Sequence, residues 1–150
     1  PEDRFFPFHT PNFLISEKKA RGDFFGYFSE SDGYCTLIST TTPFAELDGN
    51  LTTMLMLLHD LRVSYVECLV PVEDHLAIEV LTRNQFVPSA IYPAMREVAG
   101  ELKDYVILSR SMEPLNFRGM SVVGVFKPFI DQYVELWKQM SLESLEFVNE

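Results

Sequence analysis

Hydrophobic and polar residues follow two different rhythms along this chain. Two runs rich in aromatic and β-branched residues, 23–28 and 34–40, flank a polar stretch that contains Gly33, a residue able to adopt a positive φ angle. This arrangement predicts a β-hairpin. A shorter run at 12–16, within a lead-in that contains several prolines, predicts one more strand.

The middle of the chain changes to a helical rhythm. Residues 45–61 carry apolar side chains at spacings of three and four, which predicts an amphipathic helix with one buried stripe. Residues 63–70 are almost continuously apolar, as in a strand buried on both faces. A strand, a helix and a second strand in this order predict a parallel crossover.

A second helix and two further strands are predicted in the next forty residues. Asp74 can cap a helix that ends at about residue 84. Residues 87–92 and 105–110 are typical of strands, and 93–103 of a connection with some helical character. We expect 87–92 to lie beside 63–70 as a parallel neighbour, with the second helix joining them.

The C-terminal segment differs in style from the rest of the chain. After Pro114, Pro128 is suited to the first turn of a helix whose apolar face includes Trp137. The prediction is therefore one domain of the α/β (α+β) class. It has three parts: an extended aromatic lead-in (1–22), a mixed α/β core (23–114) and a C-terminal helical extension (115–150) that packs on the core.

Charge and composition exclude several classes of function. The net charge is −10 and the pI about 4.7, which disfavours binding to nucleic acid or to an anionic membrane. No apolar run approaches the roughly 20 residues that span a bilayer. Cys35 and Cys68 are far apart and show no disulfide or metal-ligand spacing, so we expect a reduced, cytoplasmic protein without a metal. The first residue, Pro1, suggests an excised domain or a processed chain, and the remainder of a longer chain is a possible partner.

The order of elements resembles the C-terminal two-thirds of the GNAT fold, that of the acyl-CoA-dependent N-acetyltransferases. The resemblance covers about 23–110. Residues 75–88 (HLAIEVLTRNQFVP) are similar to the fourth helix of the family and the turn into its sixth strand, and 104–108 (DYVIL) to its closing strand. It implies a GNAT-like mixed sheet with packing helices, acetyl-CoA or another acyl-CoA as cofactor, and a small-molecule or peptide amine as acceptor.

The resemblance also implies a set of site residues. The thioester is expected between strands 63–70 and 87–92, with backbone groups of the first strand polarising its carbonyl group. Glu67 or Tyr92 would then assist proton transfer. The residues expected to contact the cofactor are Cys68, Leu69, Val70, Gly49 and Asn50.

Three positions depart from the family pattern. The phosphate-binding loop, here 42–50, has a single glycine and carries Glu46 and Asp48, whose charges oppose phosphate groups. A tyrosine that protonates the leaving thiolate in many members is replaced by Leu81, which has no proton to donate. Gln85 replaces a glycine, which is tolerated if its φ angle stays negative.

Several roles stay open on the sequence alone. Glu67 is either a buried general base or a carboxylate hydrogen-bonded at the sheet surface. His9, His59 and His75 lack the spacing of metal ligands, and we favour structural roles for them.

Three functions are compatible with these observations. The first is acyl transfer to an amine. The second is a catalytically degenerate GNAT-like module that acts by oligomerisation, for example as a homodimer, or as part of a larger protein. The third is an aromatic-rich small-molecule binding domain with an apolar pocket near residues 5–8 and 24–28.

Overall fold

The computed structural model describes residues 10–16, 22–114, 116 and 118–146. The chain divides into two compact units, Pro1–Pro114 and Leu115–Glu150. The predictions made for residues 5–8 and for His9 lie outside the described residues.

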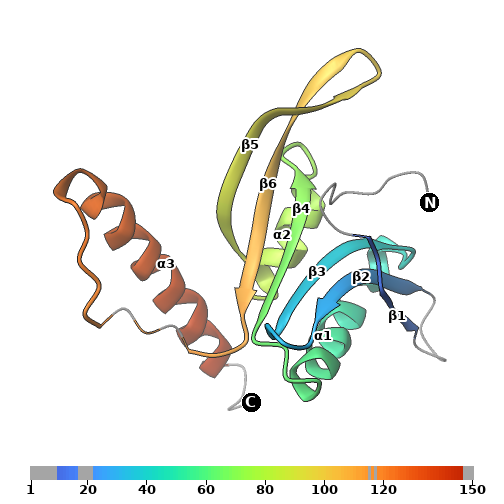
Figure 1. Cartoon of the computed structure of the whole chain (residues 1–150), viewed down its shortest axis with the longest axis horizontal. Coiled ribbons are helices and arrows are strands. Elements are labelled where there is room, and N and C mark those ends of the chain that lie inside the picture. The colour runs from blue at the N-terminus through green and yellow to red at the C-terminus, as the bar shows by residue number, and fades with distance from the viewer. Residues whose placement is uncertain (1–9, 17–21, 115, 117, 147–150) are drawn as a thin grey trace. The chain divides into compact units, whose positions relative to one another are not determined.

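The first unit is a mixed six-stranded sheet with two helices on one face (Figure 1). The strands lie in the order β1-β2-β3-β4-β6-β5, and all neighbours are antiparallel except β3 and β4. The predicted hairpin is β2–β3, with Gly33 at a φ angle of 60°, and the predicted parallel crossover is β3–α1–β4. The strands are β1 (Phe13–Ser16), β2 (Asp23–Ser29), β3 (Tyr34–Thr40), β4 (Tyr65–Pro71), β5 (Val87–Val98) and β6 (Glu101–Ser111), and the helices are α1 (Phe44–Asp60) and α2 (His75–Arg83).

The predicted pairing of 63–70 with 87–92 is wrong. Strands β4 and β5 share the sheet and run in the same direction, but β6 lies between them and is antiparallel to both. The predicted partly helical connection at 93–103 is instead the tip of the β5–β6 hairpin, which projects beyond the other strands (Figure 1). Ala99 and Gly100 form its two-residue turn with φ angles of 53° and 82°, as a type I′ turn requires.

The strand β5 is longer than predicted and contains two prolines. Pro88 and Pro93 lie in this strand, which is at the edge of the sheet, where a missing N–H does not interrupt a ladder. Each lies next to a shift in the pairing register with β6, between Pro88 and Ala90 and between Tyr92 and Arg96. The second half of β5, from Pro93, therefore resembles a connection in sequence, whereas its first half, 87–92, is correctly predicted as a strand.

The main core lies between the sheet and the two helices. Alternate residues of the strands point towards α1 and α2, because side chains along a strand alternate between the two faces of a sheet. The largest fully buried side chains are Phe86, Leu51, Met54, Leu58 and Leu108. A smaller cluster on the opposite face contains Ile38, Leu69 and Tyr105.

Both helices end in the same backbone motif. At the end of α2, Gln85 N–H donates to the Thr82 carbonyl group (2.9 Å) and Phe86 N–H to that of Leu81 (3.0 Å), the two hydrogen bonds of a Schellman motif. Gln85 has a φ angle of 65°, so the condition of a negative φ is not met. Arg62 occupies the equivalent position after α1, with a φ angle of 63°.

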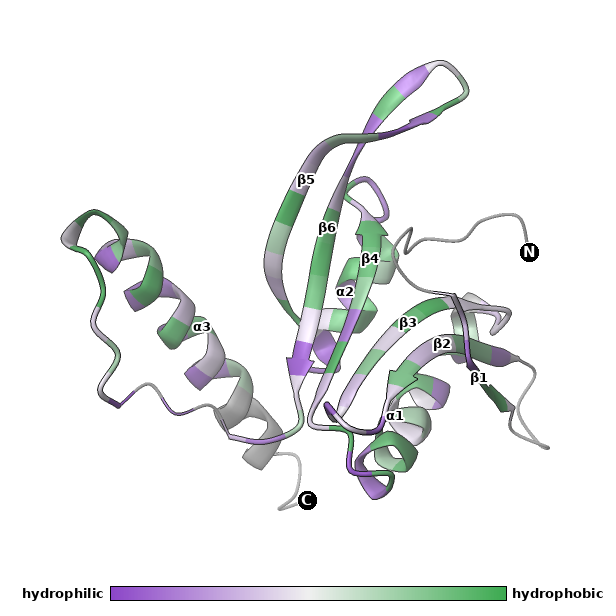
Figure 2. Cartoon of the chain, viewed as in Figure 1, coloured by the Kyte–Doolittle hydropathy of each residue, from purple (hydrophilic) through white to green (hydrophobic). Residues whose placement is uncertain are grey.

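The second unit contains a short 3₁₀ helix, η1 (Gly124–Phe126), and α3 (Lys127–Glu146). Pro128 lies in the first turn of α3, as predicted. Hydrophobic and hydrophilic residues alternate along the coloured part of α3 (Figure 2), and Phe126 and Phe129 are exposed. The packing of α3 on the core stays a prediction. Within the described part of the chain, no helix is long and apolar enough to cross a bilayer.

Candidate active site

The two parallel strands β3 and β4 separate towards their C-terminal ends. Their paired register runs from Tyr34 opposite Tyr65 to Leu37 opposite Cys68 and stops there, although both strands continue. Beyond that point β2 still pairs with β3, and β6 with β4, so each strand is held by its outer neighbour. The facing edges can offer backbone N–H and C=O groups to a bound molecule. We call this gap the β3–β4 wedge.

A cavity of about 220 Å³ occupies the wedge. Residues 37–40 of β3 and 68–71 of β4 line it, and α1 and α2 supply much of the remaining wall. Three residues predicted to contact a cofactor, Cys68, Leu69 and Val70, therefore lie together at this cavity, and their binding role stays a prediction. The predicted opening between 63–70 and 87–92 does not exist, because β6 pairs with β4 along its whole length.

Glu67 lies beside the wedge on the sheet face away from α1 and α2. Its neighbours Val66 and Cys68 belong to the helix-side core, so the carboxylate points to the other face. Glu67 precedes Leu69, which lines the wedge cavity, by two residues on that same face, or roughly 7 Å along a strand. The carboxylate therefore lies close to the wedge along β4, on the sheet face away from the helices that line the cavity.

Two tyrosine hydroxyls hold the Glu67 carboxylate. Tyr34 Oη donates to Glu67 Oε1, and Tyr65 Oη donates to Glu67 Oε2 (3.2 Å). Thr36 Oγ1 in turn donates to Tyr34 Oη (2.6 Å). The two tyrosine rings are stacked, with centroids 5.9 Å apart and an interplanar angle of 14°. We call Tyr34, Tyr65 and Glu67 the tyrosine–carboxylate cluster.

The environment of the cluster keeps both phenols protonated. Burial raises the pKa of Tyr34 well above its usual value, and the hydrogen bond to Glu67 raises it further. Burial likewise raises the pKa of Tyr65. Protonated phenols are hydrogen-bond donors, so they fix the orientation of the carboxylate over the whole range of physiological pH.

The cluster extends to residues that the sequence interpretation missed. Ser109 on β6 and Ser89 on β5 lie near the Tyr65 side chain, where their effect on its pKa opposes that of burial, and their own hydroxyl groups contact each other. The signal in the sequence was the spacing of two in Tyr34 and Thr36, and again in Tyr65 and Glu67. Only the register of β3 on β4 shows that the two pairs are opposite each other.

Tyr92, the alternative catalytic residue, is not in this cluster. It lies in β5, is 40% exposed and pairs in register with Tyr105 of β6. Tyr105 is paired with Pro71 of β4, whereas Ser109 is paired with Glu67, so Tyr92 lies level with a position four residues beyond Glu67 along the sheet. Its catalytic role stays a prediction without support from the geometry.

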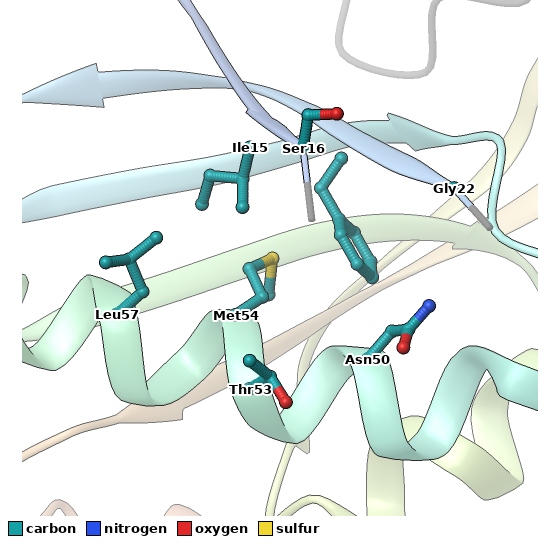
Figure 3. Close-up of a pocket in the computed structure, with 8 residues that line it drawn as sticks. Ile15, Ser16, Gly22, Asn50, Thr53, Met54 and Leu57 are labelled. Atoms are coloured by element: carbon teal, nitrogen blue, oxygen red, sulfur yellow. The ribbon is translucent and has the colours of Figure 1, made fainter. Parts of the chain in front are cut away.

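Gly49 and Asn50 lie within α1 and not in a loop. The helix begins at Phe44, so the predicted loop at 42–50 is mostly helical. Asn50 lines a smaller cavity of about 120 Å³ beside β1 and β2, together with Ile15, Met54 and Leu57 (Figure 3). This is a different cavity from the wedge, and a cofactor role for Gly49 and Asn50 stays a prediction.

The acidic residues of this segment differ in what they face. Asp48 accepts a hydrogen bond from Asn84 Nδ2 (2.5 Å) and lies 3.7 Å from Arg83 Nη1. Its charge is therefore engaged by the end of α2, contrary to the expectation that it opposes a phosphate group. Glu46 is exposed in the first turn of α1, where its charge would still oppose a phosphate group. Leu81 is buried and lines the wedge, as its apolar character predicts.

The thiols and the histidines offer little to this chemistry. Cys35 and Cys68 are free and buried, and burial raises the pKa of Cys35 to about 12 and that of Cys68 further, so neither is a ready nucleophile. His59 lies in the last turn of α1, and His75 begins α2. Within residues 10–16, 22–114, 116 and 118–146, no group of three or more His, Cys, Asp or Glu side chains could hold a metal ion.

Comparison with known proteins identifies the fold. No protein-family model and no curated protein matches the sequence. Among solved structures, the chain is similar to the ribosomal-protein-S18-alanine N-acetyltransferase from Escherichia coli, with a TM-score of 0.55, 13% identity, and coverage of 71% of each chain. It is also similar to the ribosomal-protein-alanine N-acetyltransferase from Brucella melitensis (TM-score 0.55, 10% identity, 66% of this chain and 68% of that one). The chain has a partial GNAT fold.

The GNAT fold is shared here without close sequence similarity. A third neighbour, Mycobacterium smegmatis RimJ in complex with CoA-disulfide, gives a TM-score of 0.52 at 13% identity. The matches cover 61% of this chain and 47% of RimJ, and 62% of this chain and 64% of another N-acetyltransferase structure. These comparisons establish the GNAT architecture, and the activity has to be argued from the site itself.

Proposed function

We propose that this domain transfers an acyl group from an acyl-CoA thioester to an amine. The observation that carries the proposal is the position of Glu67, a carboxylate oriented by two phenols beside a wedge between parallel strands. In this proposal the thioester arm of the donor lies in the wedge and pairs with the free backbone edges. The amine approaches from the face that carries Glu67.

Glu67 can accept the proton of the amine, whereas Leu81 cannot protonate the leaving thiolate. The amine nitrogen attacks the thioester carbonyl carbon, a C–N bond forms, and its proton passes to Glu67. The C–S bond then breaks and coenzyme A leaves as a thiolate. Because Leu81 cannot donate a proton, the thiolate takes its proton from solvent.

The chain fits the two ends of an acyl-CoA unequally. The wedge is lined mainly by apolar side chains and suits the acyl group and its thioester arm. Within the described part of the chain, no side chain forms a capping hydrogen bond at the N-terminus of α1, which favours phosphate binding there, but the charge of Glu46 in the first turn opposes it. We therefore propose acetyl-CoA or another acyl-CoA, held mainly through its arm.

We also propose a class of acceptor and a cellular compartment. In this proposal an amine on a small molecule or a peptide approaches from the sheet face that carries Glu67. Two free, buried thiols suit a reducing compartment such as the cytoplasm.

A Glu67→Gln variant tests the proposal. We expect wild-type protein to release free thiol from acetyl-CoA in the presence of a panel of amines and peptides, and Glu67→Gln to lower kcat by about 10²–10⁴-fold, the usual contribution of a general base. The thermal shift produced by acetyl-CoA should be the same in both proteins, since Glu67 does not hold the donor. At a hundredfold excess over Kd the shift corresponds to about 2.7 kcal/mol.

Glu79→Gln is the matched control. Glu79 is on α2 with a side chain 63% exposed, so the same chemical change there should leave turnover unaffected. If acetyl-CoA and longer acyl-CoAs produce no thermal shift in the wild type, the proposal fails.

A second candidate is a GNAT-like module that does not catalyse transfer and acts within an oligomer or a longer chain. Leu81 in the wall of the wedge and Glu46 at the start of α1 favour it. An acyl-CoA thermal shift without thiol release, for every amine in the panel and for Glu67→Gln alike, would support this module over the enzyme.

A further inference from the structure

Arg110 of β6 lines a second cavity of about 250 Å³ that shares no residue with the wedge. The cavity lies along the later turns of α1, where Met56, His59 and Asp60 line it, and Met112 follows β6 on its other side. Nothing in the proposed acyl transfer uses this cavity. Its chemistry can therefore be considered by itself.

The Arg110 guanidinium group is half-buried and poorly compensated. Among the described residues, its Nη1 donates a hydrogen bond to the Asn84 carbonyl oxygen (2.8 Å). Its Nε is buried and has no hydrogen-bond partner among the described residues, and no described carboxylate forms an ion pair with it. Burial lowers the pKa of Arg110, because the charged guanidinium group is poorly solvated there. A buried charge without a counter-ion is costly, so it calls for an anion as partner.

Arg83 shows the contrast within the same chain. It is 57% exposed and has two carboxylate neighbours, Glu79 at 3.3 Å and Asp48 at 3.7 Å. Arg83 therefore forms ion pairs at an exposed position, whereas Arg110 forms none with a described carboxylate, although Asp60 lines the same cavity. Arg110 is thus a half-buried arginine without an ion pair to a described carboxylate, and it lines the cavity of about 250 Å³.

The other lining residues define the kind of anion. Leu55, Met56 and Met112 provide apolar surface, and the imidazole of His59 can donate a hydrogen bond. Asp60 adds a negative charge to the same cavity. One cation and one carboxylate together tolerate a singly charged ligand and repel a dianion. A planar guanidinium group matches the two oxygens of a carboxylate.

We propose that the Arg110 cavity is a binding site for a small monocarboxylate with an apolar body, such as a short unbranched fatty acid. The carboxylate contacts the Arg110 guanidinium group, and the hydrocarbon part lies against Leu55, Met56 and Met112. This site is separate from the β3–β4 wedge, so this proposal does not depend on the acyltransferase proposal.

Titration of the full chain with hexanoate tests the site. We expect saturable changes in amide NMR signals confined to the last turns of α1 and the end of β6. Hexanamide, which keeps the shape and lacks the charge, should bind at least tenfold more weakly. Arg110→Gln should reduce hexanoate affinity to that of hexanamide, while Arg83→Gln, the matched control, should change neither.

Asp60→Asn separates binding from a purely structural role of Arg110. This exposed residue can be changed without disturbing the Arg110–Asn84 hydrogen bond, and loss of its repulsion should tighten hexanoate binding several-fold. Weaker binding in Asp60→Asn would overturn the proposal, as would equal binding of hexanoate and hexanamide to the wild type. The absence of saturable hexanoate binding, or stronger binding of inorganic phosphate than of hexanoate, would overturn it too. Acetyl-CoA should not compete with hexanoate, whatever its own affinity.

Discussion

Each oxygen of the Glu67 carboxylate accepts a hydrogen bond from a different tyrosine, one on its own strand and one on the parallel neighbour. The stacked rings of Tyr34 and Tyr65 hold the two hydroxyl groups in place. A general base works best when its orientation is fixed before the substrate arrives. In the proposed mechanism the tyrosines are therefore positioning residues, and Glu67 accepts the proton.

Tyr65→Phe should weaken catalysis by a modest factor. Removal of one hydroxyl leaves the ring stack in place but frees one carboxylate oxygen, and a hydrogen bond to a charged group contributes about 1.5–3 kcal/mol. We expect kcat to fall by roughly tenfold to a hundredfold, with an unchanged acetyl-CoA thermal shift. Tyr92→Phe is the control and should retain full activity. A loss in Tyr92→Phe equal to that in Tyr65→Phe would show that the wrong residues have been assigned.

Gln85→Gly should stabilise the protein. Gln85 has a φ angle of 65°, and this left-handed conformation costs a residue with a Cβ about 1–2 kcal/mol. Glycine avoids that cost but loses more entropy on folding, about 0.5–1 kcal/mol. We expect a net gain of roughly 0.5–1 kcal/mol in the free energy of unfolding, measured by urea denaturation. Gln85→Ala keeps the Cβ and should give no gain, so an equal gain in both variants would contradict the explanation.

At the scale of helices and strands, local patterns predicted the existence of elements well and their partners poorly. The apolar spacing in 45–61 and the cap at Asp74 each depend on near neighbours, and both are confirmed, with Asp74 Oδ1 accepting from Ala77 N–H at 3.1 Å. The position of β6 between β4 and β5 depends on a hairpin turn at Ala99 and Gly100. Alanine rarely adopts a positive φ, so no familiar turn signal marked that hairpin.

The same limit applies to the candidate site. Glu67 could be singled out because a carboxylate interrupts an apolar run. Its tyrosine partner Tyr34 is thirty-three residues away, and the contact exists only because the β3–β4 register is set by the whole crossover. Asp48 was assigned to a phosphate-binding loop, but a contact with Asn84, thirty-six residues away, engages its charge.

Asn84 is the main polar connection between α1 and α2. Its Nδ2 donates to Asp48 Oδ1 and to the Val80 carbonyl group, and its Oδ1 accepts from Thr52 Oγ1 at 3.0 Å. The side chain closes the end of α2 against α1, and the residue is only 8% exposed. These contacts link the two helices that form the helix-side wall of the wedge.

Asn84→Ala should destabilise the protein by about 1–3 kcal/mol, because it removes the hydrogen bonds that this buried side chain forms with Asp48, Thr52 and Val80. Urea denaturation monitored by circular dichroism measures this loss. Arg83→Ala is the adjacent control. Arg83 also contacts Asp48, but it forms only exposed ion pairs, so its loss should cost no more than about 0.5 kcal/mol. Similar losses in the two variants would contradict the role given to Asn84.

At the scale of the whole molecule, the two thiols lie at the centre of the sheet. Cys35 is on β3 and Cys68 on β4, both in the core between the sheet and the helices. Burial raises the pKa of Cys35 from 9.0 to about 12 and that of Cys68 further, because the thiolate is poorly solvated there. The folded protein therefore holds protons that the unfolded chain releases in alkaline solution.

This difference predicts a loss of stability at high pH. Below the ordinary thiol pKa of 9.0 both states are protonated and the stabilisation is complete. As the pH rises from 9.0 towards 12, the unfolded state binds fewer protons than the folded state, and each thiol lowers the free energy of unfolding by up to about 1.4 kcal/mol per pH unit. Urea midpoints between pH 7.5 and 10.5 should stay level at first and then fall. Cys35→Ala should have lower stability at pH 7.5, from the small cavity it leaves, but a shallower decline above pH 9, whereas Glu79→Gln should decline in parallel with the wild type. A decline in Cys35→Ala as steep as in the wild type would mean that this thiol is not enclosed by the core, and the sheet–helix packing on which the wedge depends would have to be revised.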